Sequence, residues 1–304
     1  MINITKELSS VELSPVGLGP WSFSKLKLLN SCPFSFYLQY LLKAKPLEAP
    51  PISVITEMGK AIHRVLELTV NGKSIEDAFK TTRKEFLEVL TDDQWENGCD
   101  PKNPIGVAKN EYAVTRFMER LDTFEKANPV KRFITELRIG VTKDWTPTGF
   151  FTTDIEKPEN NVYFRGVVDL ILQLENEDVI FIDHKRSVPS VVGVKNFQAQ
   201  LDTYKVLFSK GVQPYNNGCS AVHFVNDAEL TMGSTSTKQD IEENFANRIE
   251  FNIYGAVEKV KGYGYFKHIR GSQCQWCVHD PICKAGHLKP LELESKKWFP
   301  IESV

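Results

Sequence analysis

The sequence contains no run of about 18 consecutive apolar residues, the length that a membrane-spanning helix requires. Residues 1–8 carry polar and acidic side chains where a signal peptide would have an apolar segment. Both absences predict a protein without a membrane-embedded part. We therefore expect a cytoplasmic location, or the host cytoplasm if the chain is of viral origin.

Excess charge of one sign is also absent, because 37 Lys and Arg residues stand against 39 Asp and Glu residues, for a formal net charge of −2. The usual argument for nucleic-acid binding, a strongly basic chain, is therefore not available. The charge is uneven, however: residues 1–45 hold five basic and two acidic residues, and residues 255–289 hold six and two. These segments predict a basic surface on which Tyr263, Tyr265, Phe266 and Trp276 could stack against single-stranded bases. Solvated lysines and core rings are the alternative interpretation.

Cysteine is scarce, and six residues are too few for the disulfide framework of a secreted protein. Three of them, Cys274, Cys277 and Cys283, lie close together in the sequence. In a reducing compartment such a group indicates a metal or metal-cluster site. A tetrahedral or cubane site needs a fourth ligand, and for zinc this could be another cysteine, His279 or His287.

Hydrophobic periodicity predicts an α/β chain whose central elements follow the order α-β-β-β-α-β. Helical patterns cover 22–42 with a break at Pro33, 58–66, most of 71–130, 194–209 and 237–257, and strand patterns cover 133–140, 162–174, 179–185 and 221–225. Ser22 and the pair Thr237 and Asp240 are predicted to cap the first and last of these helices.

The most informative pattern is a pair of strands that carries two acids and a lysine. If residues 175–177 form a three-residue hairpin loop, Asp169 lies directly opposite Asp183, and Lys185 shares the strand face of Asp183. Two opposed carboxylates repel each other unless a cation lies between them. A hard divalent ion such as Mg²⁺ would provide this compensation. A solvated, charged hairpin face is the structural alternative.

Gly166-Val-Val-Asp169 and Asp183-His-Lys185 resemble the central motifs of the PD-(D/E)XK nuclease superfamily, specifically its RecB-like branch. The resemblance implies a restriction-endonuclease-like αβββαβ core with a mixed central sheet and flanking helices. It implies His63, in Gly59-x-x-x-His63, as a metal ligand together with Asp169 and Asp183. The backbone carbonyl of His184 is a further candidate ligand.

Three more residues follow from the same resemblance. Gln200 and Tyr204 match a Gln-x-x-x-Tyr motif that lines the site in this branch, although an ordinary packed helix face is the alternative. Glu136 is the candidate for the acid that the family tends to carry on its first strand. Lys185 is implied as the residue that assists the reaction.

The phrase around Cys32 resembles the iron–sulfur-containing members of this branch, in which one early cysteine joins three late ones around a [4Fe–4S] cluster. The resemblance implies Cys32, Cys274, Cys277 and Cys283 as cluster ligands, with zinc as the alternative. We expect one nuclease domain over 1–304. Its parts are an N-terminal helix at 21–45, a helical insert at 71–130, a catalytic core at 131–226 and a cluster-binding tail, the C-terminal iron–sulfur clasp, at 263–290.

The resemblance therefore predicts a Mg²⁺- or Mn²⁺-dependent deoxyribonuclease, with an exonuclease favoured, in DNA repair, recombination or replication. DNA is the expected partner, as single strands or duplex ends, together with a recombination or helicase protein. Gly72-Lys73-Ser74 lacks the earlier glycine of a phosphate-binding loop, because Glu67 occupies that position, so no helicase motor is expected. The alternatives are a non-cleaving DNA-binding or scaffold protein and a zinc-stabilised interaction protein.

Overall fold

The computed structural model describes residues 13–44, 54–98, 106–186, 191–263, 266–271, 274 and 277–284. The chain folds into two compact units. The terminal unit comprises residues 1–50, 140–165 and 247–304, and the central unit comprises residues 51–139 and 166–246. Within the described ranges, no helix is both long enough and apolar enough to cross a bilayer.

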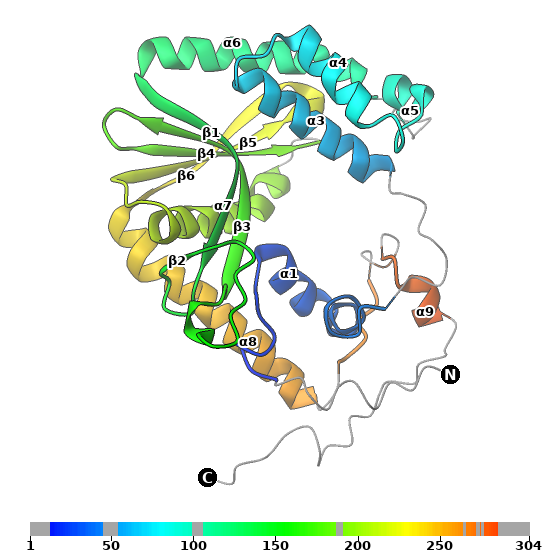
Figure 1. Cartoon of the computed structure of the whole chain (residues 1–304), viewed down its shortest axis with the longest axis vertical. Helices are drawn as coiled ribbons and strands as arrows, with labels where there is room; N and C mark the ends of the chain where they lie inside the picture. The colour runs from blue at the N-terminus through cyan, green and yellow to red at the C-terminus, as the bar shows by residue number, and fades with distance from the viewer. Residues whose placement is uncertain are drawn as a thin grey trace. The chain divides into compact units, whose positions relative to one another are not determined.

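A six-stranded sheet runs in the order β2-β1-β3-β4-β5-β6 (Figure 1). Its strands are β1 (Val130–Val141), β2 (Pro147–Thr148), β3 (Phe164–Leu174), β4 (Val179–Lys185), β5 (Asn217–Phe224) and β6 (Glu229–Thr237). β4 pairs antiparallel with β3 and parallel with β5, and β5 pairs antiparallel with β6. The predicted α/β class and the predicted mixed sheet are therefore confirmed.

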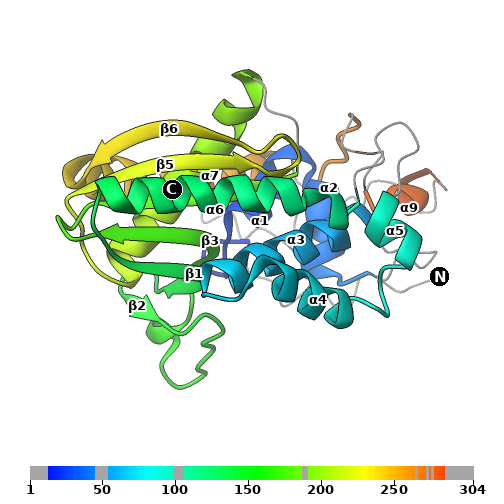
Figure 2. The same ribbon diagram turned by 90° about the horizontal axis from the view of Figure 1, so that it is seen from above.

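Helices cover both faces of the sheet in the central unit. They are α3 (Val54–Val70), α4 (Ile75–Glu85), α5 (Asp92–Asn97), α6 (Glu111–Ala127) and α7 (Val191–Gly211). Figures 1 and 2 show α3, α4 and α6 along one face and α7 along the other. One hydrophobic core combines Ile62 of α3 and Phe117 of α6 with Leu170 and Ile182 of the strands. The segment predicted as a helical insert thus supplies part of the core through α6.

Glycine at position 166 allows α7 to lie close to β3. A Cβ atom at this position would come within 2.7 Å of Leu207 Cδ1 and 3.3 Å of Tyr204 Cε1. At Gly59, by contrast, no described atom lies within 4 Å of the corresponding position. Gly59 therefore does not mark a close approach between α3 and another described segment.

The β3–β4 hairpin has the predicted register. Leu170 pairs with Ile182, and the amide of Leu174 donates to the carbonyl of Asp178 over 2.9 Å. Glu177 closes the loop at φ 64°, the left-handed conformation that a three-residue hairpin loop requires at its last position. The register places Asp169 opposite Asp183.

The terminal unit begins with α1 (Phe23–Ser31), α2 (Pro33–Phe36) and a π-helical turn at Tyr37–Leu41. The Ser22 side chain caps α1 as predicted, accepting a hydrogen bond from the Lys25 amide over 3.2 Å. Pro33 starts α2 instead of continuing α1, because proline has no amide hydrogen to donate. Phe266 is buried and stacks on Phe36 and Tyr37, so it belongs to the core and not to a base-stacking surface.

Two helices complete the described chain, α8 (Ala246–Tyr263) and α9 (Asp280–Lys284). Thr237 and Asp240 form the predicted cap: the Asp240 amide donates to Thr237 Oγ1 over 3.2 Å, and a π-helical turn then leads into α8. Tyr265, Trp276 and His287 lie outside the described residues.

Candidate active site

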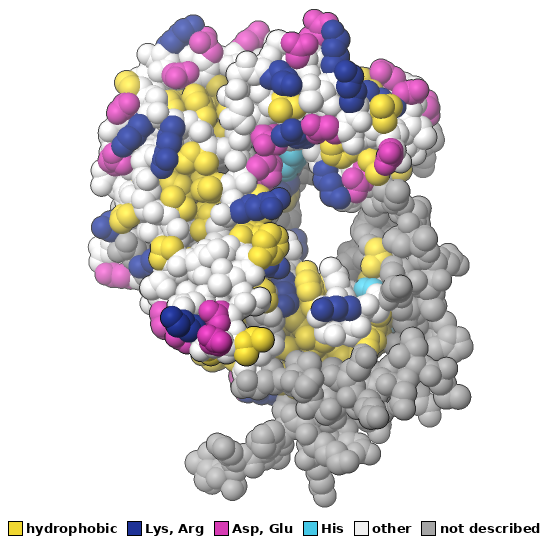
Figure 3. All heavy atoms as spheres, viewed as in Figure 1, with side chains coloured by type: hydrophobic (Ala, Val, Ile, Leu, Met, Phe, Trp, Pro, Cys, Tyr) yellow, Lys and Arg dark blue, Asp and Glu magenta, His cyan; other side chains and the backbone are white. Residues whose placement is uncertain are grey.

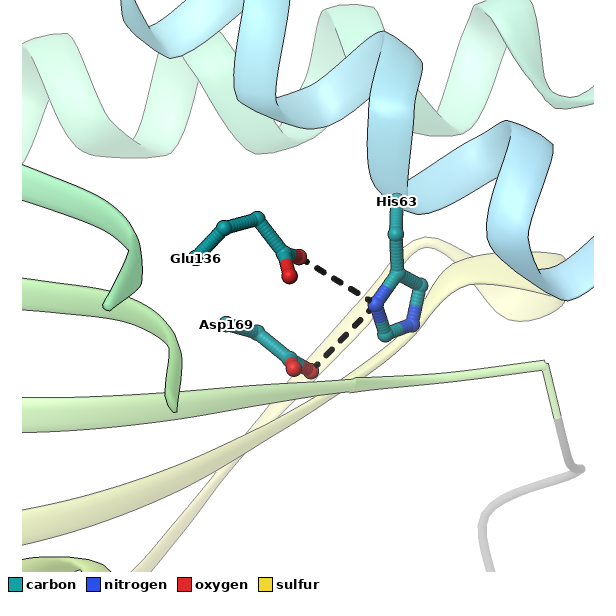
Figure 4. Close-up of side chains that lie close together, drawn as sticks. All are labelled: His63, Glu136 and Asp169. Atoms are coloured by element: carbon teal, nitrogen blue, oxygen red, sulfur yellow. Dashed lines mark ion pairs between the residues drawn. The ribbon is translucent and has the colours of Figure 1, made fainter. Parts of the chain in front are cut away.

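Three side chains from three elements of the central unit converge on one point (Figure 4). His63 of α3 presents Nδ1 to Glu136 Oε1 of β1 at 3.7 Å and to Asp169 Oδ2 of β3 at 3.6 Å. One nitrogen and two oxygens lie within 4.8 Å of one another. Because carboxylate oxygens suit Mg²⁺ and Mn²⁺ and an imidazole nitrogen can complete such a site, this trio fits a divalent metal ion.

The other ring nitrogen of His63 has a partner that fixes the ring. His63 Nε2 lies 3.0 Å from the backbone oxygen of His184. A carbonyl oxygen can only accept, so Nε2 carries a hydrogen and Nδ1 is the ring atom that faces the two carboxylates. Metal-binding histidines are typically oriented by such a bond to a backbone carbonyl. The carbonyl of His184, predicted as a further ligand, is thus a hydrogen-bond acceptor for His63.

Burial and mutual charge perturb the pKa values of Asp169, Asp183 and His63. Burial raises the pKa of Asp169, although His63 and Lys185 oppose this effect. The pKa of Asp183 is raised to about 7, first by burial and then by the charge of Asp169. Burial lowers the pKa of His63, but Asp169 and Glu136 together outweigh burial and raise it to about 9. The raised pKa values of Asp169 and Asp183 indicate that nearby positive charge does not fully compensate these buried carboxylates. A bound cation would supply the missing positive charge.

Asp183, opposite Asp169 on β4, is paired with the lysine. Its side chain is 1% exposed, and Lys185 Nζ lies 2.6 Å from Asp183 Oδ2. Gln200 of α7 donates to Asp183 Oδ1 over 3.3 Å and also to the hydroxyl of Tyr204. The structure thus gathers Lys185, Gln200 and Tyr204 around Asp183, and His63 and Glu136 around Asp169.

Glu136 reaches the site through an unusual backbone conformation. It has φ 47° in the middle of β1, a region that side-chain-bearing residues seldom occupy in a strand. Such conformations cost roughly 1–3 kcal/mol and persist where the surrounding structure enforces them. The alternating apolar and polar residues of β1 do not predict this distortion.

A neighbouring residue that the sequence did not single out is His223 of β5. It is fully buried and lies in register with His184 across the parallel β4–β5 pair. His184 Nδ1 and His223 Nδ1 are 3.0 Å apart. The contact between His184 and His223 depends on the register in which β4 and β5 pair. The register of two strands far apart in the chain cannot be predicted from a single sequence.

The sequence profile of the PD-(D/E)XK nuclease superfamily matches residues 20–284. The chain belongs to this superfamily. Its predicted motif residues Asp169, Asp183 and Lys185 all lie at the site described above.

Among curated proteins, the chain is 24% identical over 172 residues to a subunit of the ATP-dependent helicase/deoxyribonuclease of Clostridium tetani (strain Massachusetts / E88). The alignment covers 53% of this chain and 14% of that much longer relative. A crystal structure from Eubacterium rectale with a provisional exonuclease name is 11% identical, with a TM-score of 0.48, and the match covers 85% of this chain and 87% of that one.

A second potential metal-binding region lies in the terminal unit. All four predicted cysteines, Cys32, Cys274, Cys277 and Cys283, line one cavity of about 540 Å³, and none is in a disulfide. The hydroxyl of Ser35 lies 3.6 Å from Cys277 Sγ. Burial raises the pKa of Cys283 to about 11, with further contributions from Cys277 and Cys32. Residues 242 positions apart in the sequence thus meet at one cavity lined with sulfur.

Charges elsewhere on the central unit are mixed. Figure 3 shows Lys and Arg side chains interspersed with Asp and Glu over α3 and α4. Several are paired: Lys80 Nζ lies 2.6 Å from Glu76, and Arg64 Nε lies 2.9 Å from Glu85. The charges on α3 and α4 therefore partly neutralise one another.

Proposed function

We propose that this protein is a divalent-metal-dependent deoxyribonuclease. The observation that carries the proposal is the convergence of His63, Glu136 and Asp169 beside the buried pair Asp183 and Lys185. Membership of a nuclease superfamily supports the reaction class. The name of the Clostridium tetani relative, which includes the word deoxyribonuclease, supports DNA as the substrate.

The residues of the site would divide the work as follows. His63, Glu136 and Asp169 would hold a Mg²⁺ or Mn²⁺ ion, and Asp183 would approach it from the opposite strand. When bound, such an ion neutralises charge on a phosphodiester and lowers the pKa of water. Lys185, next to Asp183, would hold its ammonium group toward the scissile phosphate and stabilise the developing negative charge. Gln200 would keep Asp183 oriented through its hydrogen bond, and Tyr204 would hold Gln200.

Within DNA hydrolysis, we favour an exonuclease of the RecB-like branch that acts in repair, recombination or replication. The motif set around His63, Lys185 and Gln200 supports this branch. The relative's name joins helicase and deoxyribonuclease functions, which supports a helicase or recombination protein as a partner. Because the family match runs through both compact units, we also propose that 1–304 is a single nuclease domain.

We further propose that the four cysteines hold a [4Fe–4S] cluster. Their gathering at one cavity supports a shared ligand. A zinc ion bound at about 2.3 Å by thiolates would need sulfur atoms roughly 3.8 Å apart. Among the described residues, the one group of three potential ligand atoms within 4.8 Å of one another is the His63 trio. The cysteine cavity thus suits a larger cluster better than a single zinc ion.

The test of the proposed reaction uses DNA labelled at either end, as single strands and as duplexes, incubated with the full chain. Shortening of the labelled strands in Mn²⁺ or Mg²⁺, abolished by a chelator, is expected, and the order of product lengths gives the polarity. DNA that is bound but stays intact in every metal would favour the non-cleaving scaffold alternative. Iron, sulfide and zinc contents of anaerobically purified protein test the cluster in the same preparation.

A further inference from the structure

Two buried histidines form a pair beneath the candidate active site. His184 and His223 are 3% and 0% exposed, and their Nδ1 atoms lie 3.0 Å apart. Phe117 of α6 stacks on the ring of His223 with centroids 4.2 Å apart and meets the ring of His184 edge-on at 5.2 Å. Because side chains alternate along β4, the His184 ring lies on the sheet face opposite to Asp183 and Lys185.

The backbone of His184 connects this pair to the site. Its amide donates to Asp169 Oδ2 over 2.8 Å, and its carbonyl oxygen accepts from His63 Nε2 over 3.0 Å. The ring of His63 also packs edge-on against the ring of His184, with centroids 5.7 Å apart. One residue thus orients two members of the trio, one with its amide and one with its carbonyl group.

The contact between the two rings restricts both of them. Two Nδ1 atoms form a hydrogen bond only if one carries a hydrogen and the other a lone pair. Two neutral rings must therefore adopt opposite tautomers. A rotation that carries either Nδ1 atom away from the other breaks this bond. Since both residues lie in register on parallel strands, the bond ties the end of β4 to β5 at the residue that contacts the site.

We propose that His223 is a positioning residue for the metal site, acting through the ring and backbone of His184. The inference rests on the proposed nuclease function but goes beyond it, because His223 contacts none of His63, Glu136 and Asp169 through an interaction described above. Groups that orient metal ligands from outside typically change metal affinity about 10- to 100-fold when removed.

Two substitutions separate the hydrogen bond from packing. His223→Phe keeps a ring to stack on Phe117 but removes the bond to His184. His223→Asn removes the ring but places an amide, able to donate or accept, near the former Nδ1 position. Mn²⁺ binding to the full chain without DNA is measured by calorimetry for wild type and both variants, alongside their melting temperatures.

We expect one variant to lose metal affinity and the other to lose thermal stability. His223→Phe should weaken Mn²⁺ binding about tenfold with a small change in melting temperature, whereas His223→Asn should melt earlier but bind Mn²⁺ within about threefold of wild type. Wild-type binding by His223→Phe overturns the inference, as does a loss of affinity that follows the melting temperature in both variants. A wild-type chain that binds no Mn²⁺ overturns the proposed function itself.

Discussion

At the scale of single residues, Lys185 combines a structural contact with an implied catalytic role. It lies 2.6 Å from Asp183, which is 1% exposed. Lys185→Ala should reduce DNA cleavage at least 100-fold, because no other described lysine contacts Asp183. The fold should persist, since the pKa of Asp183 is already about 7 and the acid can take up a proton.

The measurement is metal-dependent digestion of end-labelled DNA, with circular dichroism to confirm folding. Lys80→Ala is the matched control, because Lys80 forms an exposed ion pair with Glu76 on α4, away from the site. Undiminished cleavage by Lys185→Ala would contradict the proposed mechanism.

Glu136 combines backbone strain with a ligand position, and two substitutions separate these features. Glu136→Gln and Glu136→Gly should both weaken Mn²⁺ binding, because each removes a carboxylate from the trio. Glycine accepts φ 47° without steric cost, so Glu136→Gly should be about 1 kcal/mol more stable than Glu136→Gln. Urea unfolding gives the difference, and equal stabilities would mean that the backbone stores no strain there.

Lys25 couples the stability of the terminal unit to pH. Its ammonium group is buried and donates to the carbonyl oxygen atoms of Leu18 and Pro20 over 2.6 and 3.1 Å. Burial first, and then the charge of Arg165, lowers its pKa from 10.5 to about 8. Between these values the unfolded chain binds a proton that the folded chain does not, so the free energy of unfolding should rise with pH from about 8 to 10.5.

The full effect corresponds to about 3.5 kcal/mol at 1.4 kcal/mol per pKa unit. It is measured by urea unfolding at a series of pH values, followed by the tryptophan fluorescence of the chain; Trp21 lies 5.5 Å from Lys25 Nζ. Lys25→Met is the control and should lose this rise. A wild-type stability that stays flat over the window would mean that the carbonyl groups and rings keep Lys25 protonated.

At the scale of helices and strands, two glycines of the central unit have opposite surroundings. Gly59→Ala should raise the free energy of unfolding by about 0.5–1 kcal/mol, because alanine favours the helix and no described atom lies within 4 Å of its Cβ. Gly166→Val should lower it by about 1–3 kcal/mol, because the side chain would press against Leu207 and Tyr204. Urea midpoints with unchanged slopes measure both effects, and equal signs would contradict this account.

The elements that the sequence predicts well are those with a strong local signal. The β3–β4 hairpin has alternating and buried apolar residues and a three-residue loop, so even its register follows from the pattern. β6 escapes prediction because its residues, from Glu229 to Thr237, are mostly small, polar and exposed. Its place in the sheet depends on pairing with β5, which a single sequence does not encode locally.

The residues of the candidate active site also differ in how well the sequence predicts their positions. The motif residues Asp169, Asp183 and Lys185 are predicted because hairpin register brings them together. The meeting of Glu136 with His63 depends on a backbone distortion in β1 and on the side-chain directions of α3. The contact of His223 with His184 depends on parallel pairing across 39 residues of sequence. These features arise from tertiary packing, which sequence periodicity does not determine.

At the scale of the whole molecule, the backbone passes between the terminal and central units four times, at 50/51, 139/140, 165/166 and 246/247. β1 and β3 each run through one of these passages, because Val130–Val141 includes 139/140 and Phe164–Leu174 includes 165/166. Unfolding of either unit therefore breaks strands that the other unit uses. This connectivity supports the proposal of a single domain.

We therefore expect one cooperative thermal transition for the full chain, with a calorimetric enthalpy equal to the van't Hoff enthalpy. Mn²⁺ at about 100 times its dissociation constant should raise the stability of the whole chain by roughly 2.7 kcal/mol, since metal bound in the central unit would stabilise both units together. Scanning calorimetry with and without Mn²⁺ measures both quantities. Two separate transitions, of which Mn²⁺ moves only one, would show that the units unfold independently and would contradict the single-domain proposal.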